Sequence, residues 1–165
     1  IENLFHLYDG QIEFACKRIQ LDEMFSNILE EISPKMQEQN ITATVDCTGF
    51  PSVMGNYDLL YRAFYNLIEN AIKYNVEHGE IRITSEIDAG RGKIIVSDTG
   101  CGISAEHLPQ IFDPFYRVNT PRPRKTAGSG LGLSIVKSII ERHGWSISVS
   151  SEVGRGTLFT ISQFQ

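Results

Sequence analysis

The chain has 165 residues, of which 41% are hydrophobic and 21% charged, and a formal net charge of −5. This length suits one globular domain, and the negative charge disfavours a protein that binds nucleic acid non-specifically. No apolar run reaches the roughly 18–20 residues of a membrane span. The three cysteines are far apart and form no disulfide framework, which favours a reducing compartment, and the four histidines show no metal-ligand spacing.

The first part of the chain alternates between helical and extended patterns. Residues 1–10 indicate the last turns of a helix that begins upstream, so we expect the chain to be part of a longer protein. Apolar residues at helical spacing predict a helix over 21–40, with Asp22 capping or charging its first turn. Alternating β-branched residues predict a strand over 41–47, and a turn with a possible short strand follows at 50–56.

The second part continues the alternation and completes a fold. A helix is predicted over 57–75, followed by two strands that meet in a hairpin at 88–92. The later elements are a short helix over 104–112 with Ser104 as its N-cap, a mobile loop over 113–128, a helix over 130–144, and a pair of strands over 145–164 joined by a glycine turn. The pattern predicts an α/β two-layer sandwich, in which a mixed sheet is covered on one face by about three helices.

The helix predicted over 57–75 carries a polar stripe. Asn66, Asn70, Lys73 and Tyr74 share one helical face, although an unpartnered buried amide costs roughly 1–3 kcal/mol. One interpretation is a metal–phosphate site, in which Asn70 offers a carbonyl oxygen to Mg²⁺, Lys73 neutralises phosphate, and Tyr74 faces an aromatic ring or ribose. The other interpretation is a helix end whose amides cap or bridge neighbouring loops.

Two glycine-rich segments follow the stripe. In "DTGCGI" (98–103), Asp98 could accept a hydrogen bond from an exocyclic amine such as that of adenine, or could simply form a turn. In "GSGLGLSIVK" (128–137), glycines lead into a helix N-terminus, which suits either an anion site or a flexible hinge. The second segment is neither a P-loop nor a dinucleotide fingerprint, because GK[ST] is absent and Leu133 stands where the GxGxxG pattern needs glycine.

A cluster of aromatic residues precedes the predicted loop. In "IFDPFYRV" (111–118), Phe112, Phe115 and Tyr116 fall within five residues. They could anchor a moving loop, with Arg117 reaching a phosphate. The alternative is a small hydrophobic cluster beside a solvated arginine.

Taken in order, these four stretches resemble the ATP-binding catalytic domain of the sensor histidine kinases of two-component systems. "NLIENAIKY" resembles the N box, "DTGCGI" the first glycine box, "IFDPFYRV" the F box and "GSGLGL" the second glycine box, while "GRGTLF" resembles the terminal glycine motif. The resemblance covers residues 40–163. It implies the Bergerat fold of that family, a mixed sheet packed on three helices with a mobile ATP lid.

The resemblance also implies roles for individual residues. Asn70 matches the family's Mg²⁺ ligand, Asn66 lines the same site, Lys73 contacts phosphate, Asp98 binds the adenine amine, and Arg117 is a phosphate partner. The expected catalytic positions are therefore Asn66, Asn70, Lys73 and Arg117, and the cofactors are ATP and Mg²⁺. The other expected nucleotide-binding positions are Tyr74, Gly100, Gly102, Ile103, Phe115, Gly128, Gly130, Leu131, Gly132, Leu133 and Thr157.

For the whole protein, the resemblance implies a protein-histidine kinase. Residues 1–16 resemble the tail of the dimerisation domain and 17–165 the catalytic domain. His6 lies outside the family's acceptor pattern, so the phosphoacceptor histidine is expected beyond this chain. The implied partners are the protein's own dimerisation domain, within a homodimer, and a response regulator; the isolated chain is expected to be monomeric. The implied location is the cytoplasmic side of a membrane-bound sensor.

The chain departs from the family pattern at two positions, and two rival functions are compared with the kinase. Ala127 stands where a further glycine is common, and Asn56 stands where aspartate is often found. A hydrolytic ATPase of the same fold would need a carboxylate base where Asn66 stands, and an amide cannot act as that base; Glu69 is expected to point away. A non-catalytic binding module is the second rival, and the intact Asn70, Asp98 and glycines argue against it.

Overall fold

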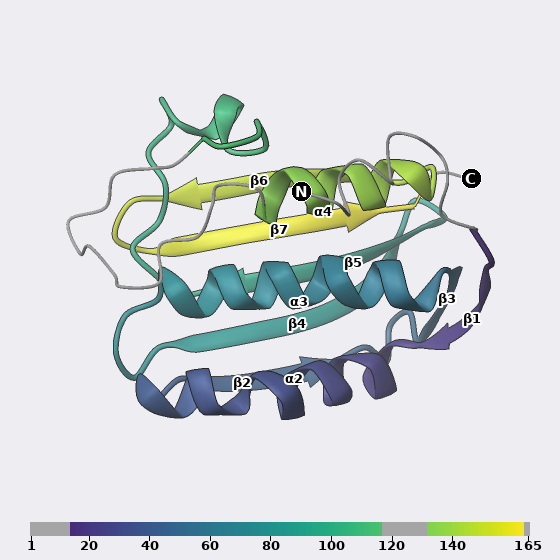
Figure 1. The fold of residues 1–165 in the computed structure, drawn as a ribbon, viewed down its shortest axis with the longest axis horizontal. Coiled ribbons are helices and arrows are strands. Elements are labelled where there is room, and N and C mark those ends of the chain that lie inside the picture. Colours follow the sequence, from purple (N-terminus) through teal and green to yellow (C-terminus); the bar gives the residue numbers. More distant parts are fainter. Residues whose placement is uncertain (1–13, 117–131, 164–165) are drawn as a thin grey trace.

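The structure of the chain is a computed structural model that describes residues 14–116 and 132–163. In chain order its elements are β1 (Lys17–Gln20), α2 (Leu21–Glu38), β2 (Thr42–Asp46), β3 (Ser52–Gly55), α3 (Tyr57–Lys73), β4 (Glu80–Asp88), β5 (Arg91–Asp98), the 3-10 turn η1 (Leu108–Gln110), α4 (Gly132–Arg142), β6 (Ser146–Glu152) and β7 (Gly156–Ser162) (Figure 1). The helix predicted over 1–10 and most of the predicted loop lie outside the described residues.

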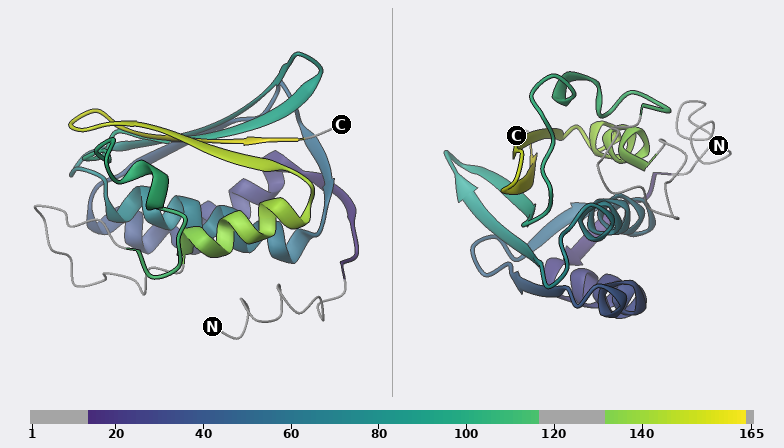
Figure 2. Two further views of the ribbon diagram at one scale, coloured as in Figure 1. Left: turned by 90° about the horizontal axis from the view of Figure 1, so that it is seen from above. Right: turned by 90° about the vertical axis from the view of Figure 1, so that its left-hand side faces the viewer.

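The elements form two layers. One layer is a five-stranded sheet in the order β2-β4-β5-β7-β6, in which β2 pairs with β4 in parallel and the other pairs are antiparallel. The three helices α2, α3 and α4 lie side by side on one face of this sheet (Figures 1 and 2). The predicted sandwich of a mixed sheet and three helices is confirmed.

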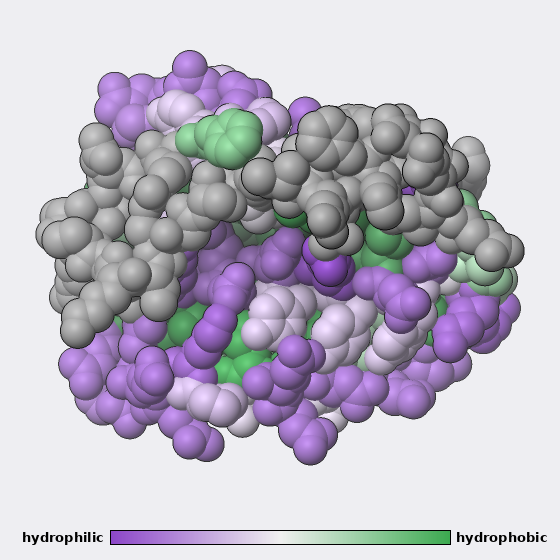
Figure 3. Space-filling model, viewed as in Figure 1, coloured by the Kyte–Doolittle hydropathy of each residue, from purple (hydrophilic) through white to green (hydrophobic). Residues whose placement is uncertain are grey.

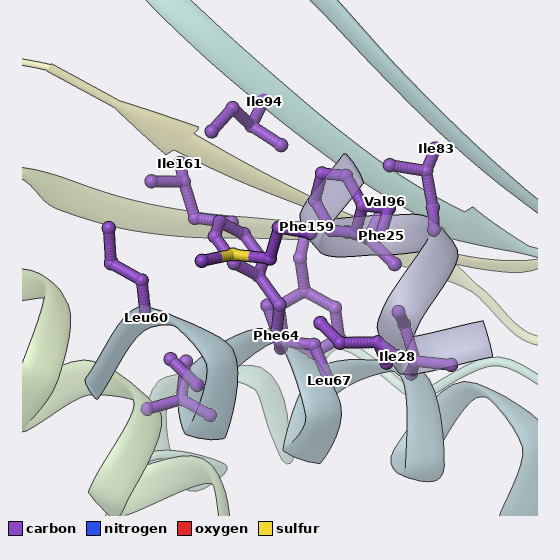
Figure 4. Packing of buried hydrophobic residues seen from close by; sticks show 14 of the residues in the cluster. Phe25, Ile28, Leu60, Phe64, Leu67, Ile83, Ile94, Val96, Phe159 and Ile161 are labelled. Atoms are coloured by element: carbon purple, nitrogen blue, oxygen red, sulfur yellow. The ribbon is translucent and has the colours of Figure 1, made fainter. Parts of the chain in front are cut away.

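The core lies between the two layers. Apolar side chains of α2 and α3 meet those of the central strands, and the rings of Phe25 and Phe64 pack edge to face with centroids 4.9 Å apart (Figure 4). Both rings are fully buried, and burying a side chain of this size contributes about 1.5–3 kcal/mol. The opposite faces of the helices are mostly hydrophilic where the described residues show (Figure 3), as expected for amphipathic helices on a sheet.

Two turns confirm predictions made from glycine positions. The β4–β5 hairpin turns at Ala89 and Gly90, whose φ angles of 53° and 79° belong to a type I′ turn. Helix α4 ends before Gly144, whose φ of 75° lets the Trp145 N–H donate back to the Ile140 carbonyl. Within the described residues, no helix combines the length and apolar character needed to cross a membrane.

Two details differ from the predictions. The short helix with Ser104 as N-cap is wrong: only the single turn η1 forms there, over Leu108–Gln110. Pro109 lies in this turn and has no N–H to donate, which limits the helix. Strand β1, over Lys17–Gln20, was not predicted because its four residues carry too short a pattern; it forms by antiparallel pairing with the short strand β3.

The start of the described chain is tied to the ends of two helices through Asn56 and His143. The Asn56 side chain caps α3 by accepting from the Leu59 N–H at 3.0 Å, and its amide group donates to the Ala15 carbonyl at 2.9 Å. The Asn56 N–H donates to His143 Nε2 at 3.0 Å. The ring of Phe14 packs edge-on against His143 with centroids 4.7 Å apart. Asn56 therefore serves as an N-cap here, a role open to asparagine and aspartate alike.

These contacts require a neutral His143. A backbone N–H can only donate, so Nε2 must accept, and the Nδ1–H donates to the Ile139 carbonyl at 2.8 Å. Burial lowers the pKa of His143, and the nearby Arg142 charge lowers it further, against the opposing effect of the Ile139 hydrogen bond. Protonation would place a second N–H opposite that of Asn56 and break the bond.

We expect this histidine to make the fold sensitive to mild acid. Because the pKa of His143 in the folded state lies below 6.5, the contribution of the neutral ring to the free energy of unfolding is fully present above pH 6.5 and is lost as the pH falls. Between pH 7 and pH 5, wild-type chain should lose roughly 1 kcal/mol, about one hydrogen bond, relative to His143→Gln. Urea unfolding at each pH measures the difference. His78→Asn, at an exposed histidine, is the matched control, and parallel curves for wild type and His143→Gln would contradict the assignment.

Candidate functional site

The polar stripe lies on the C-terminal half of α3, and all four of its side chains are partly exposed. Within the described part of the chain, the side-chain amides of Asn66 and Asn70 have no hydrogen-bond partner. Lys73 Nζ lies 5.6 Å from the centre of the Tyr74 ring. The stripe therefore presents two amides, an ammonium and a phenol toward solvent at one end of the helix, a set that suits an anionic ligand with an aromatic or sugar part.

A third amide beside the stripe has a structural role that the sequence reasoning missed. Asn75 is only 2% exposed. Its Nδ2 donates to the Glu80 carbonyl at 3.2 Å, and its Oδ1 accepts from the Val76 N–H at 2.8 Å and the Thr99 hydroxyl at 3.1 Å. Buried polar groups are normally satisfied in this way, and the contrast sets Asn66 and Asn70 apart as the amides left open to a ligand.

Asp98 ends strand β5 and is largely buried. Its Oδ1 accepts from the Gly100 N–H at 2.8 Å and the Thr157 N–H at 3.3 Å. Its Oδ2 has no hydrogen-bond partner among the described residues. Burial raises the pKa of Asp98 to about 6, although the two backbone donors oppose that shift. The site thus holds a carboxyl group with one oxygen fixed by backbone and the other free to meet a donor.

The loop after Asp98 is held against α3 and against the β6–β7 hairpin. The Cys101 N–H donates to the Tyr74 carbonyl at 3.0 Å, and the Gly154 N–H donates to the Cys101 carbonyl at 2.9 Å. Gly102 has φ +75°, and a Cβ there would overlap the Glu152 carbonyl oxygen. This close backbone approach explains the need for glycine and brings the Asp98 loop to the polar end of α3.

Thr157 joins Asp98 to a further residue that the sequence reasoning did not select. Thr157 lies opposite Asp98 in the β5–β7 ladder and opposite Ser151 in the β6–β7 ladder. Directly opposed residues share a face of the sheet, and Phe159, two residues along β7 from Thr157, is in the core. The Ser151 hydroxyl also accepts from the Ile103 N–H at 2.7 Å. No local sequence signal marks Ser151, because its partners lie on β7 and in the loop after Asp98.

The expected lid residues are only partly described. Gly132 begins α4 with open space around the position of a Cβ, and Leu133 is half-buried beside it. Arg117, Gly128, Gly130 and Leu131 lie outside the described residues.

The aromatic cluster before the expected lid divides in two. Phe112 packs edge-on against Phe159 with centroids 6.1 Å apart, and Lys137 of α4 lies 5.7 Å from its ring centre. Phe115 is 64% exposed and has φ 67°, and Tyr116 hydrogen-bonds to His107. Phe112 therefore anchors the segment to the sheet and to α4, whereas Phe115 does not join the core.

Comparison with known protein families shows to which family the chain belongs. Residues 55–165 match the family described as histidine kinase-, DNA gyrase B-, and HSP90-like ATPase. The chain belongs to this ATPase family. The matched range contains the polar stripe, the Asp98 loop and Thr157, and ATP is the nucleotide of this domain.

Sensor kinases are among the relatives of this ATPase domain. The phosphate regulon sensor protein PhoR of Pseudomonas aeruginosa is 35% identical over 144 residues, which are 87% of this chain and 32% of PhoR. The sensor histidine kinase RppB of Synechocystis is 40% identical over 142 residues, which are 86% of this chain and 31% of RppB. The chain thus spans about a third of the length of these curated relatives.

Solved histidine kinases share the fold of the ATPase domain. The catalytic domain of histidine kinase ThkA superposes with a TM-score of 0.76 at 26% identity, covering 90% of this chain and 97% of that one. Full-length ShkA in complex with AMPPNP gives a TM-score of 0.81 at 26% identity, covering 98% of this chain and 34% of that one. The chain is an ATP-binding catalytic domain of the histidine kinase type.

Proposed function

We propose that this domain binds ATP with Mg²⁺ at the polar end of α3 and transfers the γ-phosphate to a histidine on the dimerisation helices of its parent protein. The observation that supports it most is the junction of the two halves of the site. The hydrogen bond from the Cys101 N–H to the Tyr74 carbonyl joins the Asp98 loop, which suits an adenine amine, to the helix that carries the amides of Asn66 and Asn70. One ligand that matches both halves is a nucleotide with its base at Asp98 and its phosphates at the stripe.

The residues present fit a Mg²⁺ ion held together with the phosphates. Asn70 offers a half-buried amide oxygen that has no hydrogen-bond partner among residues 14–116 and 132–163, and Mg²⁺ is usually bound by one or two protein oxygens plus phosphate oxygens and water. When bound, Mg²⁺ neutralises charge on the phosphates during transfer. Asn66 lines the same face, and Lys73 stabilises the phosphate charge directly. Arg117 completes this proposal as a phosphate partner.

The groups near the stripe favour transfer of the phosphate to a histidine over its hydrolysis. Hydrolysis needs a base that activates water, and general-base catalysis is typically worth 10²–10⁴-fold. Asn66 cannot serve as that base, and Glu69 forms an ion pair with Lys35 of α2 on another face of α3. The γ-phosphate is therefore stable until an imidazole arrives, and positioning and charge neutralisation carry most of the transfer.

The proposal extends to the parent protein. The sensor kinase relatives are about three times as long as this chain, so we assign residues 1–16 to the end of a dimerisation domain and 17–165 to the catalytic domain. The histidine acceptor lies on that dimerisation domain, which forms a homodimer, and the phosphate passes on to a response regulator. The catalytic domain works on the cytoplasmic side of a membrane-bound sensor.

Labelling with γ-labelled ATP tests this division of labour. The chain alone should bind Mg²⁺·ATP without labelling itself, because none of His6, His78, His107 and His143 lies in an acceptor pattern. Adding the parent's separately prepared dimerisation helices should give acid-labile, base-stable label on those helices alone. Label on the isolated chain, or hydrolysis at the rate of a dedicated ATPase, would refute the proposal.

A further inference from the structure

We propose that Ser151 is a positioning residue for base selection: it fixes the Thr157 hydroxyl so that the site offers only hydrogen-bond acceptors to position 6 of a purine. This inference rests on the proposed function and deepens it. Ser151 itself is not placed in contact with the nucleotide. Its effect is transmitted through Thr157, which is its direct neighbour on β7 and the neighbour of Asp98 on the other side.

The Ser151 hydroxyl has a single hydrogen to donate. Its oxygen lies 2.7 Å from the Ile103 nitrogen, 2.9 Å from the Gly156 carbonyl oxygen and 2.8 Å from Thr157 Oγ1. A backbone N–H can only donate and a carbonyl can only accept. Ser151 therefore donates to Gly156 and accepts from Ile103, and its remaining lone pair must accept the hydrogen of Thr157.

The direction of this hydrogen decides what Thr157 can offer to a ligand. With its only hydrogen committed to Ser151, the Thr157 oxygen can accept a further hydrogen bond but cannot donate one. Asp98 behaves in the same way: its Oδ1 receives the N–H groups of Gly100 and Thr157, and its Oδ2 has no partner among the described residues. A row of acceptors thus lies across β7 and β5 at this end of the sheet.

This row of acceptors distinguishes a 6-amino purine from a 6-oxo purine. A 6-amino group can donate hydrogens to Asp98 and Thr157, whereas a 6-oxo group places its own lone pairs against the lone pairs of these acceptors. A site built to bond a donor rejects the analogue that lacks it, because the acceptors then remain unpaired in a poorly solvated place. Without Ser151, the Thr157 hydroxyl would be free to rotate and donate to a 6-oxo base, so discrimination would weaken while the rest of the site stayed intact.

ATP and inosine triphosphate (ITP) are suitable probes, because they carry identical ribose and phosphates and differ only at position 6, where an oxo group replaces the amine, and at the adjoining N1, which gains a hydrogen. Their affinities, each measured by calorimetry with Mg²⁺, give a ratio in which metal and phosphate contacts cancel. In Ser151→Ala the ATP/ITP affinity ratio should fall about five- to tenfold, the size of one hydrogen bond. Ser151→Thr should restore the wild-type ratio, and Ser150→Ala should keep it, since Ser150 is exposed on the same strand.

A second pair of variants keeps the test decisive if Ser151→Ala does not fold. Thr157→Val should lower the ratio and Thr157→Ser should preserve it. Adding Ser151→Ala to Thr157→Val should lower it no further, because both changes act on one hydroxyl. A wild-type ratio in folded Ser151→Ala or Thr157→Val overturns the role of Ser151 while ATP binding stands. Failure of wild-type chain to bind ATP would instead refute the proposed function.

Discussion

Asp98→Asn should lose ATP affinity by about 10- to 150-fold and yet unfold at a higher temperature than the wild type. The loss is the size of a hydrogen bond to a charged group, about 1.5–3 kcal/mol. The asparagine Oδ1 can keep the bonds to Gly100 and Thr157 that Asp98 now holds. Its Nδ2 then replaces the free oxygen and brings hydrogens against the hydrogens of the adenine amine.

The gain in stability follows from the pKa of Asp98. Because burial raises it to about 6 from 3.8, the folded chain binds more protons than the unfolded chain between these values. Stability therefore falls as the pH rises from about 4 to about 6, and at pH 7 the buried carboxylate costs on the order of 1–3 kcal/mol. The neutral asparagine avoids this cost, as is common where a functional group is kept at the expense of stability.

Calorimetry with ATP and thermal unfolding from pH 4 to pH 8 measure both effects. In the wild type, the affinity for adenosine, which carries no titrating phosphate, should also fall as the pH drops through about 6, because protonation removes the free acceptor, whereas Asp98→Asn should show no such step. Asp88→Asn, at an exposed aspartate paired with Lys93 at the far end of the same hairpin, is the matched control. Wild-type ATP affinity in folded Asp98→Asn would exclude the adenine role.

Asn70→Ala should abolish the dependence of nucleotide affinity on Mg²⁺ while leaving adenosine binding unchanged. The expected loss of Mg²⁺·ATP affinity is at least tenfold, because the amide oxygen is the proposed protein ligand of the metal. The fold should tolerate the change, since the Asn70 side chain has no hydrogen-bond partner within the described residues and alanine favours a helix.

The comparison is made by titrating ATP and adenosine with and without Mg²⁺. Asn27→Ala, which removes an exposed amide from α2, is the control for loss of a helix-surface asparagine. If Asn70→Ala responds to Mg²⁺ as the wild type does, Asn70 is not a metal ligand, and another oxygen of the site must be sought.

Much of the fold was predictable because its signals are local. The spacing of apolar residues predicted α2, α3 and α4, and the Ala89–Gly90 turn between alternating strands predicted the β4–β5 hairpin. The residues that escaped prediction depend on distant partners. Strand β1 exists through its pairing with β3, and Asn75 is recognisable as a structural amide only once its bonds to Glu80 and Thr99 are seen.

The site shows the same division between local and distant information. Sequence motifs selected Asn66, Asn70 and Asp98 as candidates, and the structure shows how the Asp98 loop reaches the end of α3. Ser151 carries no motif, because its three hydrogen-bond partners lie on other strands and loops. Phe115, which its motif predicts to lie at the nucleotide, is the exposed member of its cluster, and its contact with the nucleotide stays a prediction.

The pairing of β5 with β7 determines when the site can form during folding. Asp98 and Thr157 are neighbours in the sheet but 59 residues apart in sequence, whereas β4–β5 and β6–β7 are hairpins that close over short loops. The proposed base-binding half of the site therefore forms only when the two finished hairpins join. A chain still emerging from the ribosome without β7 cannot use ATP as a template for folding, so the nucleotide stabilises the completed domain alone.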